Sequence, residues 1–306
     1  MNAPAHIPVL RDTSVSLLAA GPGRRIVDGT FGQGGHALAL LATGAEVLGL
    51  DLDPDAGVVG RALAAAESRF HFQHRSFRDL AGALAAAGWA QADGLLLDLG
   101  VSSLQIDEPS KGFTYRTDAP LDLRFDPAGG PSAADLLARL DETALATLLW
   151  KYGEERRSRR IAAAMVAARR EAPLTTTGAV REVVASAVGR GPMLTPTLSR
   201  VFQALRIAVN DELGALQDAL EQAPARLAAG GRLVVISYHS LEDRAVKQWL
   251  ARESRDCLCP PRTPACFCGH RRTMTLLTRR AEVPPAAEVG TNPRARSAKL
   301  RAAERL

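Results

Sequence analysis

Cysteine is absent from the first 256 residues of this 306-residue chain, and all four cysteines fall between Cys257 and Cys268. A secreted fold held together by disulfides is therefore not expected. Aromatic residues are also scarce, at 5%. No apolar run approaches the roughly 18 residues of a membrane span, and the first residues lack the basic-then-apolar order of a signal peptide. These absences predict a cytoplasmic protein that does not cross a membrane.

Charge is modestly positive and unevenly placed. The formal net charge is +5, but residues 151–170 hold seven basic residues against two acidic ones, and residues 270–306 hold nine against three. Basic patches favour a polyanion such as nucleic acid as partner, although a charge run is often only a solvated face.

Strand and helix patterns alternate over the first hundred residues. We expect strands at 25–29, 46–50, 70–74 and 93–99, with helices at 34–42, 54–67 and 77–87 between them. The fourth strand, DGLLLDL, is apolar enough to be buried on both faces. This alternation predicts an α/β fold with a parallel sheet and right-handed crossovers.

The alternation stops at about residue 107. A loop rich in Gly, Pro and Asp at 109–131 is followed by helical patterns at 132–150, 153–170, 176–188 and 197–228. The pattern GGRLVVIS at 230–237 then restores a strand, a helix follows at 241–253, and 274–278 and 297–301 are candidates for last strands, with antiparallel pairing possible. We therefore predict a doubly wound sheet domain in two parts, 1–106 and 214–306, interrupted by an all-helical insertion, 107–213.

The segment from Ile26 to His36, IVDGTFGQGGH, has the strongest functional pattern. An apolar strand leads into four glycines, at positions 29, 32, 34 and 35. Glycine allows positive φ and lets a ligand lie against bare backbone, and the amides that begin the next helix point outward. The loop suits a nucleotide-like ligand, and a structural turn is the alternative.

Two acids should lie beside this loop, because ligands in open α/β sheets bind outside the carboxyl ends of the strands. Asp51 closes the second strand about 20 residues beyond the loop, where a carboxylate accepts protons from a ribose diol. Asp53 is the second choice, and either residue could instead cap the helix that begins near Pro54. Asp28 closes the first strand, where it suits a cationic amino-acid moiety better than a pyrophosphate. It therefore favours S-adenosylmethionine over NAD.

Candidate groups for a reaction follow the fourth strand and the strand at 230–237. LDLGVSS brings Asp98, Ser102 and Ser103 to the expected crevice, and ISYHSLEDR brings His239. The serines are equally suited to capping a turn or helix. A lone histidine is more often a satisfied polar group than a base.

The cysteines form the pattern C-x-C-x6-C-x-C at positions 257, 259, 266 and 268, with His270 nearby. Metal knuckles more often use C-x2-C. We therefore assign no metal site, with a structural zinc as the alternative. Without a metal, we expect free buried thiols.

Taken together, the motifs DGTFGQGGH, LDLDP, LLLDLGVSSLQID, KGFTYRTDAPLDLRFD, YGEER, ISYHSLEDR and NPRARSAKLR resemble the bacterial small-subunit ribosomal RNA methyltransferase H family, also called MraW. They occur in order over nearly the whole chain. The resemblance implies a Rossmann-like methyltransferase domain with a helical, substrate-recognising insertion. It also implies S-adenosylmethionine as cofactor and N4-methylation of a cytidine in the decoding region of 16S rRNA, in the small ribosomal subunit.

By position, the cofactor contacts of that family fall on Gly34, Gly35, His36, Asp51, Phe77, Asp98 and Gln105. The sequence departs from the D/N-P-P-Y motif of many amino-methyltransferases, because Asp98 is followed by Leu-Gly-Val-Ser-Ser. The acceptor of the cytosine amino proton therefore stays open among Asp98, Ser102, Ser103 and His239. The alternatives are an NAD-dependent oxidoreductase and an RNA-binding assembly factor without catalytic activity. The sequence does not decide between naked RNA and an assembled subunit, and it does not give the oligomeric state.

Overall fold

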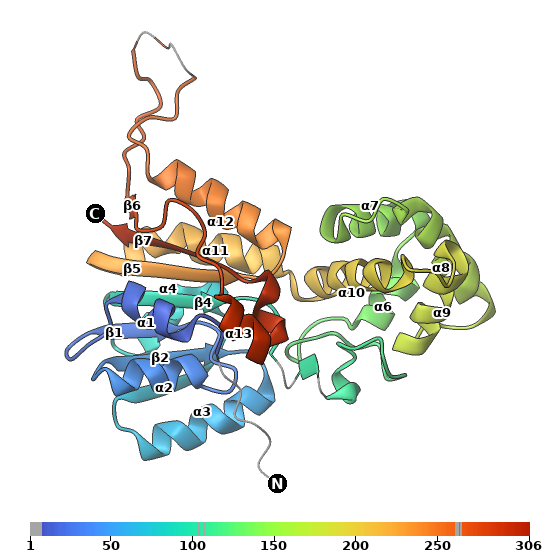
Figure 1. Cartoon of the computed structure of the whole chain (residues 1–306), viewed down its shortest axis with the longest axis horizontal. Coiled ribbons are helices and arrows are strands. Elements are labelled where there is room, and N and C mark those ends of the chain that lie inside the picture. The colour runs from blue at the N-terminus through green and yellow to red at the C-terminus, as the bar shows by residue number, and fades with distance from the viewer. Residues whose placement is uncertain (1–7, 103–104, 107, 261–262, 264) are drawn as a thin grey trace. The chain divides into compact units, whose positions relative to one another are not determined.

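A seven-stranded sheet dominates the part of the chain that the computed structural model describes, which is residues 8–102, 105–106, 108–260, 263 and 265–306. The strand order is β3-β2-β1-β4-β5-β7-β6 (Figure 1). Strands from β3 to β5 pair in parallel, whereas β7 pairs antiparallel with both β5 and β6. The strands are β1 (Arg25–Asp28), β2 (Glu46–Asp51), β3 (Phe70–His74), β4 (Ala92–Asp98), β5 (Leu227–Ser237), β6 (Met274–Leu276) and β7 (Lys299–Arg305).

Strand order reverses between β1 and β4. From β1 the chain moves outward through β2 to β3, and it then returns to pair β4 with the other side of β1. In doubly wound sheets, the crevice at such a reversal is where ligands bind. The last residues of β1, β2, β4 and β5 therefore meet at one edge of the sheet, as the sequence predicted.

Helices cover both faces of this sheet. On one face, side chains such as Leu40 and Ala56 join a core with the strands, and on the other face Leu216 and Trp249 do so. The helices of the first face are α1 (Arg11–Leu18), α2 (Gly35–Ala42) and α3 (Pro54–Ala66). Those of the second are α4 (Leu80–Ala86), α11 (Glu212–Arg226) and α12 (Ser240–Glu253). Three short elements complete the sheet unit: η1 (Phe77–Asp79), α13 (Ala286–Thr291) and η3 (Pro293–Ser297).

The chain divides into two units, Met1–Gly100 with Leu213–Leu306 and Val101–Glu212. The second unit is helical and has its own core, in which Leu145, Ile161 and Val201 are fully buried. Its elements for which the structure gives bounds are η2 (Pro109–Lys111), α6 (Ala133–Arg139), α7 (Glu142–Gly153), α8 (Ser158–Glu171), α9 (Thr177–Val188) and α10 (Leu194–Asn210). The expectation of no strand there agrees with the described residues, in which Pro120 and Thr176 form only an isolated bridge.

Two long helices expected from the sequence are each broken in the structure. The pattern at 132–150 forms α6 and α7, because Leu140 is extended and Asp141 caps α7 by accepting from the N–H of Ala144 at 2.7 Å. The pattern at 197–228 forms α10 and α11, because Asp211 has a φ of 47°. Apolar periodicity continues through both breaks, so it does not reveal them.

The strands after the insertion also differ in extent from the expectation. Antiparallel pairing of the last strands is confirmed, but β7 is Lys299–Arg305 rather than 297–301. Strand β5 begins at Leu227, before the glycine pair. Among the described residues, none of the helices is both long and apolar enough to span a membrane.

Candidate active site

The loop after β1 needs glycine at several positions. A Cβ on Gly29 would lie 2.6 Å from Leu97 Cδ2 and 3.3 Å from the carbonyl oxygen of Leu96. Gly32 and Gly34 have φ angles of 53° and 76°, in the region that favours glycine. Gly34 caps α2, so Gly34 and Gly35 place backbone at the start of that helix, as the sequence predicted.

Asp51 holds this loop from the end of β2. Its Oδ2 accepts a hydrogen bond from the N–H of Gly32 at 2.7 Å, and its Oδ1 accepts one from the N–H of Asp53 at 2.8 Å. Burial raises the pKa of Asp51, although these backbone donors oppose the shift. A carboxylate oxygen has room for more than one donor. Asp51 is therefore able to brace the loop and also to accept from a ligand hydroxyl.

Asp53 has the capping role that the sequence left open. Its Oδ1 accepts from the N–H of Asp55 at 2.9 Å, and Pro54 occupies the first turn of α3. The structure thus separates the two acids: Asp53 caps the helix, and Asp51 faces the glycine loop.

Asp28, at the end of β1, is fully buried. Burial raises the pKa of its carboxyl to about 6, against the opposing influence of His36. Its Oδ1 accepts from the N–H of Thr30 at 3.2 Å, whereas Oδ2 is buried with no hydrogen-bond partner among the described residues. A buried acceptor without a partner is costly, so this atom is a candidate for contact with a ligand.

Asp98 lies between two other polar side chains. The hydroxyl of Tyr238 donates to its Oδ1 at 2.8 Å, and Nε2 of His36 lies 3.4 Å from its Oδ2. The His36 contact is an ion-pair distance rather than a hydrogen bond, because neither ring nitrogen of His36 has a hydrogen-bond partner in the described part of the chain. The backbone N–H of Asp98 donates to Thr30 Oγ1 at 2.7 Å. Three strand ends thus meet at Asp98.

Burial and neighbouring carboxylates shift the pKa values of the side chains in this cluster. Burial lowers the pKa of His36, but the carboxylates of Asp98 and Asp28 outweigh it and raise the pKa above its ordinary value. Burial and the neighbouring Asp98 hold the pKa of Tyr238 well above its usual range, so the phenol stays protonated and donates. The Asp98 side chain is 18% exposed against 6% for His36. Asp98 is therefore the more accessible of the two.

Tyr238 is the functional candidate that the sequence reasoning missed. It lies in the predicted motif ISYHSLEDR and directly follows Ser237, the last residue of β5. The rule that strand ends line the crevice applied to it as much as to His239. The position of Tyr238 after a strand end thus pointed to it, but His239 was chosen because histidine is the more usual base.

His239 itself caps α12. Its Nδ1 accepts from the N–H of Glu242 at 3.4 Å, and its Nε2 lies 3.1 Å from Glu242 Oε1. The Glu242 carboxylate in turn accepts from the N–H groups of Tyr238 and His239. This reciprocal capping gives His239 a structural role, as in the alternative that the sequence left open. A catalytic role for it stays a prediction.

Phe77 begins η1 after β3 and packs partly buried against the core beneath the glycine loop. Its Cβ would lie 3.1 Å from a Cβ on Gly29. The side chain is therefore next to the glycine loop, and its contact with the cofactor, which the resemblance implies, stays a prediction.

Ser102 and Gln105 belong to the second unit and bond to each other. The N–H of Ser102 donates to Gln105 Oε1 at 2.9 Å, and the N–H of Gln105 donates to Ser102 Oγ at 3.2 Å. Ser102 thus has the capping role named as its alternative, and its predicted role in catalysis and that of Gln105 in cofactor binding stay predictions. Ser103, also a predicted catalytic residue, lies outside the described residues.

Arginines gather at the start of α8 in the helical unit. Arg156, Arg157, Arg159 and Arg160 are exposed, whereas Glu155 between them and α7 is buried and accepts from Arg200 Nε at 2.6 Å. Glu155 is thus paired inside the unit, and the four exposed arginines at the start of α8 are called the basic face of α8 below.

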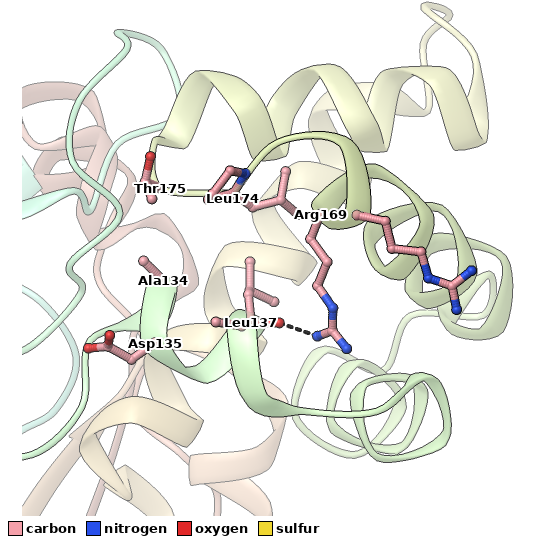
Figure 2. Close-up of a pocket in the computed structure, with 9 residues that line it drawn as sticks. Ala134, Asp135, Leu137, Arg169, Leu174 and Thr175 are labelled. Carbon is pink, nitrogen blue, oxygen red and sulfur yellow. Dashed lines mark hydrogen bonds between the residues drawn. The ribbon is translucent and has the colours of Figure 1, made fainter.

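A cavity of about 370 Å³ also lies in the helical unit (Figure 2). Arg169, beside it, donates to the carbonyl oxygens of Leu137 and Leu140, so its guanidinium supports the loop after α6. The residues that line the cavity include Ala134, Leu174 and Thr175. The cavity is thus built within the helical unit and contains none of the predicted cofactor contacts.

Comparison with known proteins identifies the family of the chain. Residues 3–306 match the MraW methylase family. The chain is 48% identical to a ribosomal RNA small subunit methyltransferase H from Thermomicrobium roseum, over 98% of this chain and 94% of the relative. Proteins of the same name from Rhodospirillum centenum and Deinococcus radiodurans are 48% and 49% identical, over 100% and 98% of this chain and 94% and 90% of theirs.

The match therefore covers both the sheet unit and the helical unit. Every predicted cofactor contact, from the glycine loop to Gln105, lies within it. The chain belongs to the MraW methylase family, and it is an S-adenosylmethionine-dependent methyltransferase with a Rossmann-like α/β sheet.

Proposed function

We propose that this protein methylates N4 of a cytidine in the decoding region of 16S rRNA, in the small ribosomal subunit. The names of the relatives support a substrate in small-subunit rRNA. The observation that carries the proposal is the group of Asp28, His36, Asp98 and Tyr238 at the strand-order reversal, in which Asp28 and His36 are buried and Asp98 and Tyr238 are partly buried. A protein with this activity acts in the cytoplasm, as predicted from the sequence.

The residues at the sheet edge fit S-adenosylmethionine. This cofactor carries a positive sulfonium and an ammonium group, and the unpartnered Oδ2 of Asp28 is a buried anionic acceptor. We assign the ribose hydroxyls to Asp51, the adenine to the apolar side of Phe77, and close backbone approach to Gly34 and Gly35. His36 and Gln105 complete the proposed contacts. When bound, the cofactor supplies a methyl group on a good leaving group.

Catalysis then depends on positioning and on proton acceptance. The lone pair of the cytosine amino group is delocalised into the ring, so acceptors on its hydrogens favour the nucleophilic form. Asp98 is the first candidate for this role because it is anchored by Tyr238 and remains partly exposed. Ser102, Ser103 and His239 remain proposed contributors.

Nitrogen rather than carbon-5 is the proposed target atom. Methylation at carbon-5 requires a thiolate to add to carbon-6 of the ring, and so needs a cysteine in the crevice. All four cysteines lie between α12 and β6, after the last strand end of the crevice. An amino group needs only orientation and hydrogen-bond acceptors, which this edge of the sheet offers.

We assign contacts with the RNA backbone to the basic face of α8 and to the basic C-terminal segment, residues 270–306. Exposed arginines at positions 156, 157, 159 and 160 suit phosphate contacts, which dominate nucleic-acid affinity. The target cytosine must leave its stack to reach the sheet edge.

The test is transfer of a labelled methyl group from S-adenosylmethionine to small subunits that lack the modification. Wild type should label the subunit RNA, and Asp98→Asn should label it much more slowly while keeping its fold. Binding of RNA without any transfer would favour the assembly-factor alternative and overturn the proposal. Comparing isolated 16S rRNA with assembled subunits in the same assay identifies the substrate form.

A further inference from the structure

The four cysteines come together in the segment that joins α12 to β6. The Sγ atoms of Cys257, Cys259, Cys266 and Cys268 all lie within 4.8 Å of one another. The thiols are free, and Cys259 is partly exposed while the other three are exposed. The expectation of buried thiols was therefore wrong. No part of the proposed methyl transfer uses them.

Sulfur–sulfur distances in this cluster match a tetrahedral metal site. The separations are 3.5 Å for Cys257–Cys266, 3.6 Å for Cys266–Cys268, 3.9 Å for Cys257–Cys268 and 4.0 Å for Cys259–Cys266. A zinc–sulfur bond of about 2.3 Å gives tetrahedron edges of about 3.8 Å. The C-x-C spacing thus does not prevent the four sulfurs from surrounding one centre.

Two disulfides fit this arrangement less well. A disulfide would bring its sulfurs to about 2.05 Å and separate the four atoms into two pairs. The observed contacts are instead of similar length across pairs, and Cys266 lies within 4.0 Å of each of the three other sulfurs.

Backbone amides of the same segment point at the sulfurs. The N–H of Leu258 donates to Cys268 Sγ at 3.3 Å, and the N–H of Cys259 donates to Cys257 Sγ at 3.4 Å. Such donors favour the thiolate, which is the form that binds metal. His270 is engaged elsewhere, because its Nε2 lies 3.0 Å from the carbonyl oxygen of Arg252.

This segment has little else to hold its shape. No described residue from Ser254 to Thr273 is buried, and Phe267, between two of the cysteines, is 77% exposed. The last residue of this segment is attached to the end of α12, because the N–H of Thr273 donates to the carbonyl oxygen of Glu253 at 2.9 Å. Figure 1 shows the excursion extending away from the sheet between α12 and β6. A chain segment without a core needs a cross-link to keep one structure, and a metal supplies it.

We propose that Cys257, Cys259, Cys266 and Cys268 bind one Zn²⁺ in a closed, structural tetrathiolate site that orders this excursion. Four thiolates select a soft ion such as zinc over magnesium or calcium, and four protein ligands leave no position for catalysis. The site is separate from the cofactor crevice. The zinc proposal is therefore tested independently of the proposed methyl transfer.

The first test is metal content. The reduced full-length protein is incubated with ZnSO₄, desalted and analysed by inductively coupled plasma mass spectrometry, with an expected one zinc per chain. The double variant C257S/C266S should retain none, whereas the control F267S, in the same segment but not a ligand, should match wild type. Because the cysteines are outside the core, the double variant should unfold as cooperatively as wild type. Absence of zinc in wild type, or equal zinc in wild type and the double variant, would overturn the proposal.

A second test uses the unmodified chain. Zinc should protect all four thiols from a maleimide, and a strong chelator should make all four reactive, as counted by intact mass. Replacing Zn²⁺ with Co²⁺ should give the visible absorption of a tetrahedral tetrathiolate. Equal alkylation with and without zinc, disulfides in the freshly purified chain, or iron as the bound metal would contradict the zinc assignment.

Discussion

The hydroxyl of Tyr238 donates a hydrogen bond of 2.8 Å to Asp98 Oδ1, and this bond joins the end of β5 to the end of β4. The two strands are neighbours in the sheet, with Asp98 paired to Ile236 in register. We propose two roles for Asp98, which are contact with the cofactor and acceptance of the amino proton. The orientation of Asp98 therefore depends on Tyr238. Tyr238 itself is unable to accept the amino proton at neutral pH, because its pKa is raised.

Tyr238→Phe should slow methyl transfer at least about tenfold. It removes one hydrogen bond to a carboxylate, worth roughly 1.5–3 kcal/mol, while the ring continues to fill its place. The measurement is single-turnover transfer at saturating S-adenosylmethionine. Tyr115→Phe is the matched control, because it removes a phenolic hydroxyl that hydrogen-bonds to Ser199 Oγ within the helical unit. Equal rates for Tyr238→Phe and wild type would show that Tyr238 does not position Asp98.

Asp51 and Asp53 should separate cofactor affinity from stability. Asp51→Asn should weaken S-adenosylmethionine binding at least about tenfold in calorimetry, since charge-assisted bonds to hydroxyls are removed. Asp53→Ala should lower the free energy of unfolding by about 1 kcal/mol, because it removes the cap of α3, with a smaller effect on affinity. The assignment of the ribose to Asp51 is wrong if its variant binds as tightly as wild type.

Asp28 should make the cofactor-free protein less stable as pH rises. Its pKa is about 6 when folded, against roughly 3.9 for an unfolded aspartate, so the folded state holds the proton more tightly. The contribution is complete below about pH 4 and is lost as pH rises through about 6, with a total loss of about 3 kcal/mol. Denaturant unfolding across this range should show a loss that is larger in wild type than in Asp28→Asn by about 3 kcal/mol.

Saturating S-adenosylmethionine should reduce that pH dependence, because a cation beside Asp28 favours its ionised form. If the two proteins have parallel stability curves without cofactor, Asp28 does not titrate as described. If only the cofactor effect is missing, Asp28 titrates but does not contact the cation.

The basic face of α8 should bind RNA rather than cofactor. Changing Arg156, Arg157, Arg159 and Arg160 to Ala should weaken RNA binding. It should also flatten the dependence of log affinity on log salt by roughly 0.7–0.9 for each phosphate that an arginine no longer neutralises. Affinity for S-adenosylmethionine should not change. A fall in cofactor affinity with unchanged RNA binding would reverse the roles assigned to the two units.

The sheet was predictable because apolar runs ending in Asp28, Asp51 and Asp98 follow from local pattern and from the rules of parallel sheets. The breaks at Leu140 and Asp211 were not, since they depend on single backbone angles within continuous apolar periodicity. The separate roles of Asp51 and Asp53 also required the three-dimensional structure, because both residues suit either role.

Long-range contacts account for the remaining differences at the site. The Tyr238–Asp98 bond spans 140 residues, so no local spacing reveals it. The cysteine cluster, by contrast, lies outside the cofactor crevice and within a short stretch of chain, but the C-x-C spacing alone did not favour it.

The most direct measurement is the identity of the methylated nucleoside. Small-subunit RNA is treated with the protein and S-adenosylmethionine, digested to nucleosides, and compared by mass spectrometry with authentic N4-methyl and C5-methyl cytidine. The proposal predicts an N4-methyl product from wild type and also from a folded chain with serine at all four cysteine positions. A C5-methyl product, or complete loss of activity in a stably folded cysteine-free chain, would contradict it.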